Sequence, residues 1–134
     1  MSDGEIGAFI LEFESCSLPK SSWTHAKHLI MALWYVRRHG PAEATALVRD
    51  GIRRLNASQG NTTGYHETIT LAWLAVIGCF LEGRDESRSV ADLSAELLEE
   101  CGDKDHLLRY YSRDRLFSEE ARARWVPPDL APIV

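Results

Sequence analysis

The stretch from Gly64 to Glu82, GYHETITLAWLAVIGCFLE, decides the fold of this chain. After a polar start, it contains an unbroken run of 11 apolar or small residues from Leu71 to Leu81. A helix that is apolar on nearly all sides lies in the core of a protein rather than on its surface. We therefore predict a helix over about Tyr65 to Glu82 as the central and most buried element.

The rest of the chain also favours helices, and no segment has the pattern of a strand. Apolar residues recur at helical spacing near the N-terminus, and Gly40-Pro41 separates two further helices. We predict five main helices: Asp3–Glu14, a second from a Ser21 or Ser22 cap to His39, a third from Pro41 through Leu55, Tyr65–Glu82, and Ser89–Glu100. Shorter helices are expected at Asp103–Tyr111 and from Ser118 to about Arg124, before an extended tail from Trp125. The predicted fold is an all-α, single-domain helical bundle spanning residues 1–134.

The composition narrows the class of protein. A net charge of -5 disfavours nucleic acid and anionic membranes as partners, because phosphate binding needs a concentrated basic surface. The polar, acidic start Met1–Gly7 does not resemble a signal peptide, and the longest apolar run is shorter than the roughly 20 residues that span a bilayer. Cys16, Cys79 and Cys101 are widely spaced and favour neither a disulfide framework nor a zinc knuckle. We expect a cytoplasmic protein without nucleic-acid or membrane partners, and no pattern indicates an oligomeric state.

Histidines gather at the starts of two apolar helices. Trp23-Thr24-His25-Ala26-Lys27-His28 carries two of the five histidines, and Gly64-Tyr65-His66-Glu67 carries a third beside a carboxylate. His25 and His28 are three positions apart and therefore project from the same face of a helix. If the two helices pack side by side, His25, His28, His66 and Glu67 meet across the seam, as metal ligands do in helical bundles.

This ligand set suits a divalent ion such as Zn²⁺, Fe²⁺, Mn²⁺ or Ni²⁺. His66 and Glu67 are then the candidate catalytic residues, with Glu67 as a fourth ligand or a general base. Two other interpretations stay open. One is a metal-free polar pocket, and the other is a set of purely structural roles in which the histidines order loops and Glu67 interacts with the helix dipole. The signatures His-Glu-x-x-His and Gly-x-Ser-x-Gly and the P-loop are absent.

Further polar residues are candidates for binding a ligand in the same pocket. Glu14 ends the first predicted helix, Tyr110 belongs to a Tyr-Tyr pair, and Ser118 and Arg122 follow in the last third of the chain. Because arginine binds carboxylates bidentately, a pocket lined by these residues favours a small anionic molecule. The alternative is that Tyr110 packs the end of the bundle while the nearby arginines pair with neighbouring acids.

Several of these motifs together resemble a family of bacterial all-helical proteins that has no assigned function. The resemblance covers nearly the whole chain and lies in Glu14 to His28 with its Trp-Thr-His-x-x-His motif, Tyr65-His66-Glu67-Thr68-Ile69-Thr70, Tyr110-Tyr111, Leu116-Phe117-Ser118-Glu119-Glu120-Ala121-Arg122 and Pro128-Asp129. It implies no activity, but it groups His25, His28, His66, Glu67, Ser118 and Arg122 in one pattern. A weaker resemblance is to DinB-like four-helix bundles, which bind a divalent metal through three histidines. The His-x-x-x-His pair of that fold is absent here, so its chemistry is not carried over.

Two functional hypotheses follow from these observations. The first is a small cytoplasmic protein with a His/Glu-lined pocket between the second and fourth predicted helices. That pocket binds a divalent metal or a small anionic molecule, and an enzymatic activity is open. The alternative is a non-catalytic interaction or regulatory module, in which the histidines only organise helix starts. In that case the tail with Trp125 and Pro127-Pro128 docks on the body of the protein or on a partner.

Overall fold

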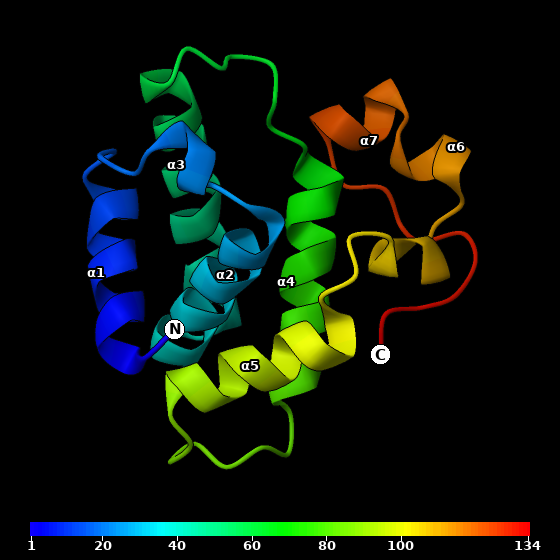
Figure 1. Cartoon of the computed structure of the whole chain (residues 1–134). Helices are drawn as coiled ribbons and strands as arrows, with labels where there is room; N and C mark the ends of the chain where they lie inside the picture. Colours follow the sequence, from blue (N-terminus) through cyan, green and yellow to red (C-terminus); the bar gives the residue numbers. More distant parts are fainter.

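The central element is α4 (Glu67–Leu81) in the computed structural model, which describes all 134 residues. Helices α2 (His25–His39) and α3 (Pro41–Ser58) pack against one side of it, and α7 (Glu119–Ala123) packs against the other (Figure 1). Because neighbours surround α4, its buried side chains lie on several sides of the helix: Thr68, Ala72, Trp73, Leu74, Val76, Ile77 and Phe80. The prediction of a central, buried helix is confirmed.

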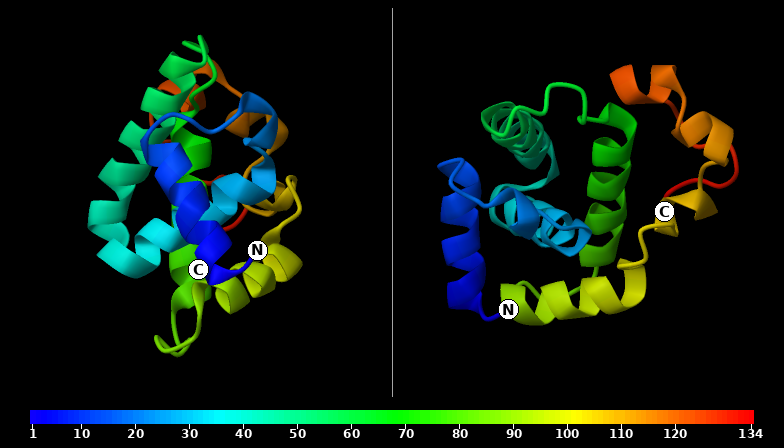
Figure 2. Two further views of the ribbon diagram at one scale, coloured as in Figure 1. Left: turned by 60° about the vertical axis from the view of Figure 1, so that its left-hand side comes forward. Right: turned by 45° about the horizontal axis from the view of Figure 1, so that its top comes forward.

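The remaining helices cover the outside of this centre. α1 (Asp3–Glu14) flanks α3, and α5 (Val90–Cys101) lies across one end of the bundle, where it contacts α1 and α2 (Figures 1 and 2). Short helices complete the chain, namely η1 (Lys20–Ser22), η2 (His106–Arg109) and α6 (Arg113–Leu116). The chain contains no strand, so the all-α prediction is confirmed.

One cluster of 29 buried hydrophobic residues forms the core. The apolar residues that recur at helical spacing in α1 all belong to it, and none is more than 2 % exposed: Ile6, Phe9, Ile10 and Phe13. Burying each of these side chains stabilises the fold by about 1.5–3 kcal/mol relative to leaving it exposed. α3 comes close to α1 at Gly51, where an added Cβ would lie 2.6 Å from the ring of Phe13. Glycine at this position therefore permits the contact between the two helices.

Side-chain caps determine where the helices begin. α2 begins at His25, because the Thr24 side chain accepts a hydrogen bond from the Lys27 N–H at 3.3 Å. The prediction of a cap at Ser21 or Ser22 is wrong, since both residues belong to the short helix η1. α2 ends at His39, Gly40 follows with a φ of 83°, and Pro41 begins α3 at once. A left-handed glycine followed by proline is an efficient stop and restart, because few other residues adopt that φ without strain.

The predicted extended tail is confirmed, and it docks on the body of the protein. The Tyr111 hydroxyl donates to the Val126 carbonyl at 2.7 Å, and the Val126 N–H donates to the Thr68 hydroxyl at 3.1 Å. The Arg115 guanidinium donates to the Pro127 carbonyl at 2.6 Å. These bonds satisfy backbone groups that an extended segment cannot pair within itself.

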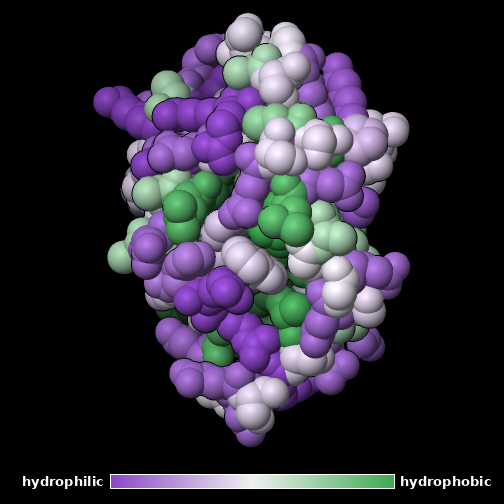
Figure 3. Space-filling view, turned by 90° about the vertical axis from the view of Figure 1, so that its left-hand side faces the viewer, coloured by the Kyte–Doolittle hydropathy of each residue, from purple (hydrophilic) through white to green (hydrophobic).

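The face of the molecule on the side of α1 is mainly hydrophilic (Figure 3). Seen from the side of α1, hydrophobic residues appear as separate patches between hydrophilic ones (Figure 3). Leu11 on α1 is one of the exposed apolar side chains. None of the helices combines the length and the apolar character that crossing a membrane requires.

Candidate ligand-binding site

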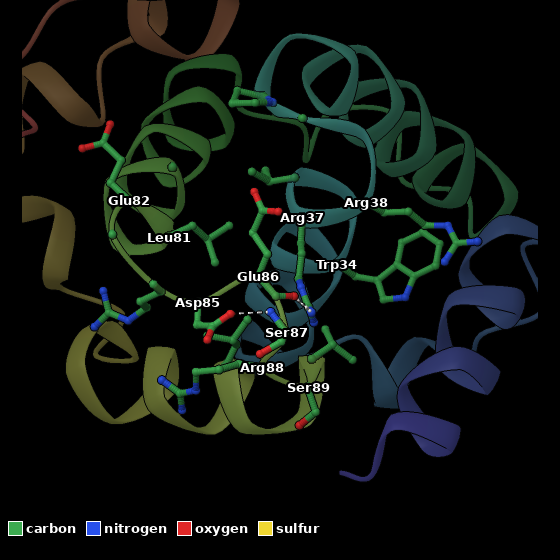
Figure 4. A pocket seen from close by; sticks show the side chains of 18 of the residues that line it. Trp34, Arg37, Arg38, Leu81, Glu82, Asp85, Glu86, Ser87, Arg88 and Ser89 are labelled. Carbon is green, nitrogen blue, oxygen red and sulfur yellow. Dashed lines mark hydrogen bonds between the residues drawn. The ribbon is translucent and has the colours of Figure 1, made fainter.

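The structure contains two cavities of a size that could hold a ligand. The larger, of about 1120 Å³, lies beneath the loop that joins α4 to α5 and is lined mainly by polar residues (Figure 4). In this cleft the Arg37 guanidinium donates to the Glu86 carbonyl at 2.7 Å and holds the loop against the end of α2. The smaller cavity, of about 330 Å³, lies between α2, α3 and α4.

Most charged groups of the larger cleft are bound to other groups of the protein. Arg84 pairs with Glu96 and Glu100, which lie on α5. The Asp85 carboxylate accepts the Ser87 N–H at 2.8 Å, and the Asp3 carboxylate accepts the Ala91 N–H at 2.8 Å. These contacts account for the polar lining as a set of loop and helix-end interactions. The smaller pocket is therefore the better candidate for a ligand site.

The smaller pocket joins an apolar wall to a few polar groups. This combination is typical of ligand pockets, in which apolar surface supplies affinity and a small number of polar atoms fix orientation. Its lining comes from three helices: His25, His28, Leu29, Met31 and Ala32 of α2, Val48 and Ile52 of α3, and Ile69, Thr70 and Trp73 of α4. The helical spacing predicted that His25 and His28 project together, and the structure brings both to this pocket.

His28 is held in one orientation. Its Nδ1 lies 2.7 Å from the Thr24 carbonyl, and its ring stacks on Trp23 with the centroids 3.6 Å apart. Since a carbonyl only accepts, Nδ1 carries the proton, and Nε2 of the neutral ring keeps its lone pair. Burial lowers the pKa of His28, an effect that the bond to Thr24 opposes and the neighbouring His25 reinforces. The neutral form is therefore favoured.

His25 has an unused nitrogen. Its Nε2 is buried and has no hydrogen-bond partner in the protein. The ring packs edge-on against Trp73, with the centroids 5.4 Å apart. Burial lowers the pKa of His25, while the Gly102 backbone and Asp103 act in the opposite direction. A buried polar atom without a partner costs free energy, and a bound ligand would remove that cost.

His66 does not reach this pocket, because both of its ring nitrogens are bound elsewhere. Nδ1 accepts the Ile69 N–H at 3.1 Å and so caps α4, and Nε2 donates to the Leu116 carbonyl at 2.8 Å. Burial lowers the pKa of His66, and Arg122 adds to the effect while the Leu116 bond opposes it. The geometry gives His66 a structural role, and no ring nitrogen is left for a metal or for proton transfer.

Glu67 is also engaged outside the pocket. Its carboxylate accepts two hydrogen bonds from Arg49, at 3.0 and 2.8 Å, and a third from the Tyr65 hydroxyl. Burial raises the pKa of Glu67, but the bonds from Arg49 and Tyr65 outweigh burial, and the net pKa lies below 4.5. Glu67 is therefore an ionised partner in an ion pair between α3 and α4.

The four predicted metal ligands consequently do not form one cluster. His25 and His28 line the pocket, whereas His66 and Glu67 are bound to other groups of the protein. No group of three or more His, Cys, Asp or Glu side chains in the structure has an arrangement that could hold a metal ion.

The other predicted ligand-binding residues lie outside the pocket as well. Glu14 accepts from the Tyr35 hydroxyl at 2.7 Å, and the Tyr110 hydroxyl lies 3.4 Å from His106 Nε2. Ser118 caps α7, and Arg122 donates to the carbonyls of Thr63 and Tyr65. Glu14 and Arg122 thus connect separate segments of the chain, whereas Tyr110 and Ser118 make local contacts. The structure does not bring the four residues to one shared polar site, which corrects that prediction.

Several residues at or beside the pocket were not predicted. Met31 and Thr70 line it, and Trp73, a member of the hydrophobic core, forms part of its wall. His106, from the short helix η2, stacks on Trp73 with the centroids 5.6 Å apart. In the sequence, only the spacing of three between His25 and His28 indicated members of this lining, and no pattern singled out Met31, Thr70 or His106.

No family model, curated protein or solved structure matches this chain.

Proposed function

We propose that this protein binds a small ligand in the pocket between α2, α3 and α4, through the nitrogen lone pairs of His25 and His28. The observation that carries the proposal is the pair of imidazoles, His25 and His28, in the lining of one apolar pocket, together with the buried His25 Nε2 that has no hydrogen-bond partner in the protein. His28 adds a second imidazole whose orientation the Thr24 carbonyl holds. Native proteins rarely leave such an atom unpaired, so it supports a partner that comes from outside the chain.

The lining selects the chemistry of the ligand. No lysine, arginine, aspartate or glutamate contributes to the pocket, so a fully charged organic anion would lack a cationic partner there. Each neutral imidazole has one nitrogen with a free lone pair. This nitrogen accepts a hydrogen bond from an N–H or O–H group, or it binds a metal ion. The proposal thus keeps the histidines of the sequence-based hypothesis, but it favours an uncharged ligand over an anionic one.

The walls set the size of the ligand. A volume of about 330 Å³ is at the small end of the range for ligand pockets, and the Trp73 indole together with aliphatic side chains forms most of the surface. These features suit a flat, mainly apolar molecule with one polar edge. In an enzymatic version of the proposal, His28 Nε2 acts as the general base, because a neutral imidazole held through its other nitrogen is suited to take up a proton.

Indole and 1-methylindole test the proposal as a matched pair of probes. Both are flat and apolar, but only indole has an N–H that His28 can accept. We expect indole to bind saturably to the wild-type protein and to shift the Trp73 side-chain resonance in NMR spectra. 1-Methylindole should bind to the wild-type protein about tenfold more weakly than indole, as expected for one lost hydrogen bond in an apolar site. Indole should bind to a His28→Leu variant about tenfold more weakly than to the wild type, for the same reason.

A His39→Leu variant is the control, because His39 lies at the far end of α2 and does not line the pocket. It should bind indole as the wild type does. If indole and 1-methylindole bind with equal affinity, and each binds to His28→Leu as tightly as to the wild type, the His28 imidazole does not recognise the ligand. An absence of saturable indole binding would contradict the proposal for this ligand class.

A further inference from the structure

The Trp23 indole covers one face of the His28 ring. The two ring centroids lie 3.6 Å apart, and the ring planes differ by 26°, which is a stacked arrangement. His28 lines the pocket between α2, α3 and α4, whereas Trp23 does not. An effect of Trp23 on a ligand in this pocket must therefore act through the His28 imidazole.

Two contacts restrain different motions of the His28 ring. The hydrogen bond from Nδ1 to the Thr24 carbonyl, at 2.7 Å, holds one corner of the ring. A single bond of this kind leaves the ring free to tilt about the contact, and the terminal side-chain torsion of histidine has only a broad preference of its own. The Trp23 indole lies against the face of the ring and opposes that tilt. Together the two contacts fix the direction of Nε2.

We propose that Trp23 is a positioning residue for ligand recognition by His28. Its indole holds the plane of the imidazole, so that Nε2 accepts the N–H or O–H group of a ligand along one direction. The inference rests on the proposed function and names the residue that aligns its hydrogen bond. Hydrogen bonds weaken steeply when they are misaligned, so a ring that tilts freely would lose the preference for a ligand with an N–H group.

Trp23 is itself held in place by α1 and by its own backbone. Its ring centroid lies 5.4 Å from that of Phe13 and 6.3 Å from that of Phe9, and both phenylalanines are buried in the core. The Trp23 N–H donates to the Lys20 carbonyl at 3.2 Å across η1. A binding group is precise when packing locks the residues that support it. α1 contributes no residue to the pocket lining, but it supports recognition through Trp23.

The two indole probes separate positioning from a general effect on the fold. In calorimetric titrations, Trp23→Leu should bind indole about tenfold more weakly than the wild type, because the ring that accepts the N–H is no longer aligned. The same variant should bind 1-methylindole within about twofold of the wild type, since this probe uses only the apolar walls. Trp23→Phe keeps a flat ring against His28 and should retain the preference for indole. Trp125→Leu is the matched control, because Trp125 does not line the pocket, and it should bind both probes as the wild type does.

NMR spectra that correlate the ring protons of His28 with its ring nitrogens test the inference without a ligand. At a pH at which His28 is neutral, the wild type should show a protonated Nδ1 and an Nε2 with a free lone pair, since the bond to Thr24 sets the tautomer. In Trp23→Leu the ring should leave this bond part of the time. Both nitrogen shifts should then move toward the average of the two tautomers, and Trp23→Phe should resemble the wild type.

The outcomes distinguish this inference from the proposed function. Circular dichroism melts establish that each variant is folded, and Trp23→Met takes the place of Trp23→Leu if the latter does not fold, because methionine fills irregular apolar gaps. Unchanged His28 nitrogen shifts in the folded variant, an unchanged preference for indole, or equal weakening of both probes would overturn the inference. If the wild type binds no indole, the proposed function fails for this ligand class, and the His28 shifts still decide whether Trp23 holds the ring.

Discussion

At the scale of single residues, two histidines near the start of apolar helices have opposite roles. His66 uses both ring nitrogens within the protein, bridging the first turn of α4 to the Leu116 carbonyl, 50 residues away in sequence. His25 leaves its Nε2 without a partner. The difference comes from what each ring faces in the folded chain, since both residues occupy the start of a helix.

Replacing His66 should destabilise the protein because it leaves two partner groups unpaired. His66→Ala removes the bonds to both Ile69 N–H and the Leu116 carbonyl, and we expect a loss of about 2–4 kcal/mol in the free energy of unfolding. His66→Asn keeps a good capping group but cannot span the distance to Leu116, and it should lose about half as much. Urea denaturation measures both values. Losses below about 0.5 kcal/mol in both variants would contradict the structural role.

At the scale of elements, one ion pair connects α3 to α4. Arg49 and Glu67 form two parallel hydrogen bonds, and Tyr65 adds a third to the same carboxylate. The Arg53 guanidinium lies over the Tyr65 ring at 4.5 Å from its centroid. Both partners of the pair are largely shielded, with 29 % and 15 % of the Arg49 and Glu67 side chains exposed. The contact therefore fixes how the two helices that form the pocket lie against each other.

A double-mutant cycle of Arg49→Met and Glu67→Gln should measure this coupling. Each single variant leaves a shielded charged group without its partner, so the double variant should be less destabilised than the sum of the two. We expect a coupling energy of about 1–2 kcal/mol, reduced at high salt because both groups retain some contact with solvent. Additive effects would show that the pair does not stabilise the helix contact. Folded Glu67→Gln should bind indole as the wild type does, because Glu67 does not line the pocket.

At the scale of the whole molecule, buried neutral histidines make the fold sensitive to acid. His66 connects the start of α4 to the C-terminal segment, and His106, the first residue of η2, stacks on Trp73. Burial is the main cause that lowers the pKa of each below 6.5, and Arg122 and Arg109 respectively lower it further. The unfolded chain therefore takes up protons at these residues at a higher pH than the folded protein does.

The free energy of unfolding should consequently fall as the pH falls from about 6.5 toward the pKa values of the folded protein. Above about pH 6.5, these two histidines should not make the free energy of unfolding depend on pH. Carboxylates with ordinary values of 4.5 and 3.8 titrate at lower pH, so a comparison of about pH 7 with pH 5.5 isolates the histidines. Urea denaturation at the two pH values measures the slope. His106→Gln, which cannot titrate, should reduce the slope, and an unchanged slope in that variant would contradict the assignment of His106.

Local sequence determined the helical elements and the breaks between them. Hydrophobic periodicity identified α1 with its bounds Asp3–Glu14, and the apolar run of α4 predicted its central place. Gly40 and Pro41 marked the change from α2 to α3. These features depend on the preferences of residues a few positions apart, and such preferences are readable without knowledge of the rest of the chain.

Tertiary structure alone decided which polar groups meet. Side-chain spacing predicted that His25 and His28 share a face, but the rotation of α4 about its own axis turned His66 toward Leu116 and Glu67 toward Arg49. The pocket needs Val48 and Ile52 from α3 as well, and no pattern in α2 or α4 indicates that contribution. The physical reason is that the packing of helices depends on how the side chains of the whole core fit together. Glu67 and His66 bond to residues 18 and 50 positions away in sequence, and no local stretch of sequence contains the contacts that bring these partners together.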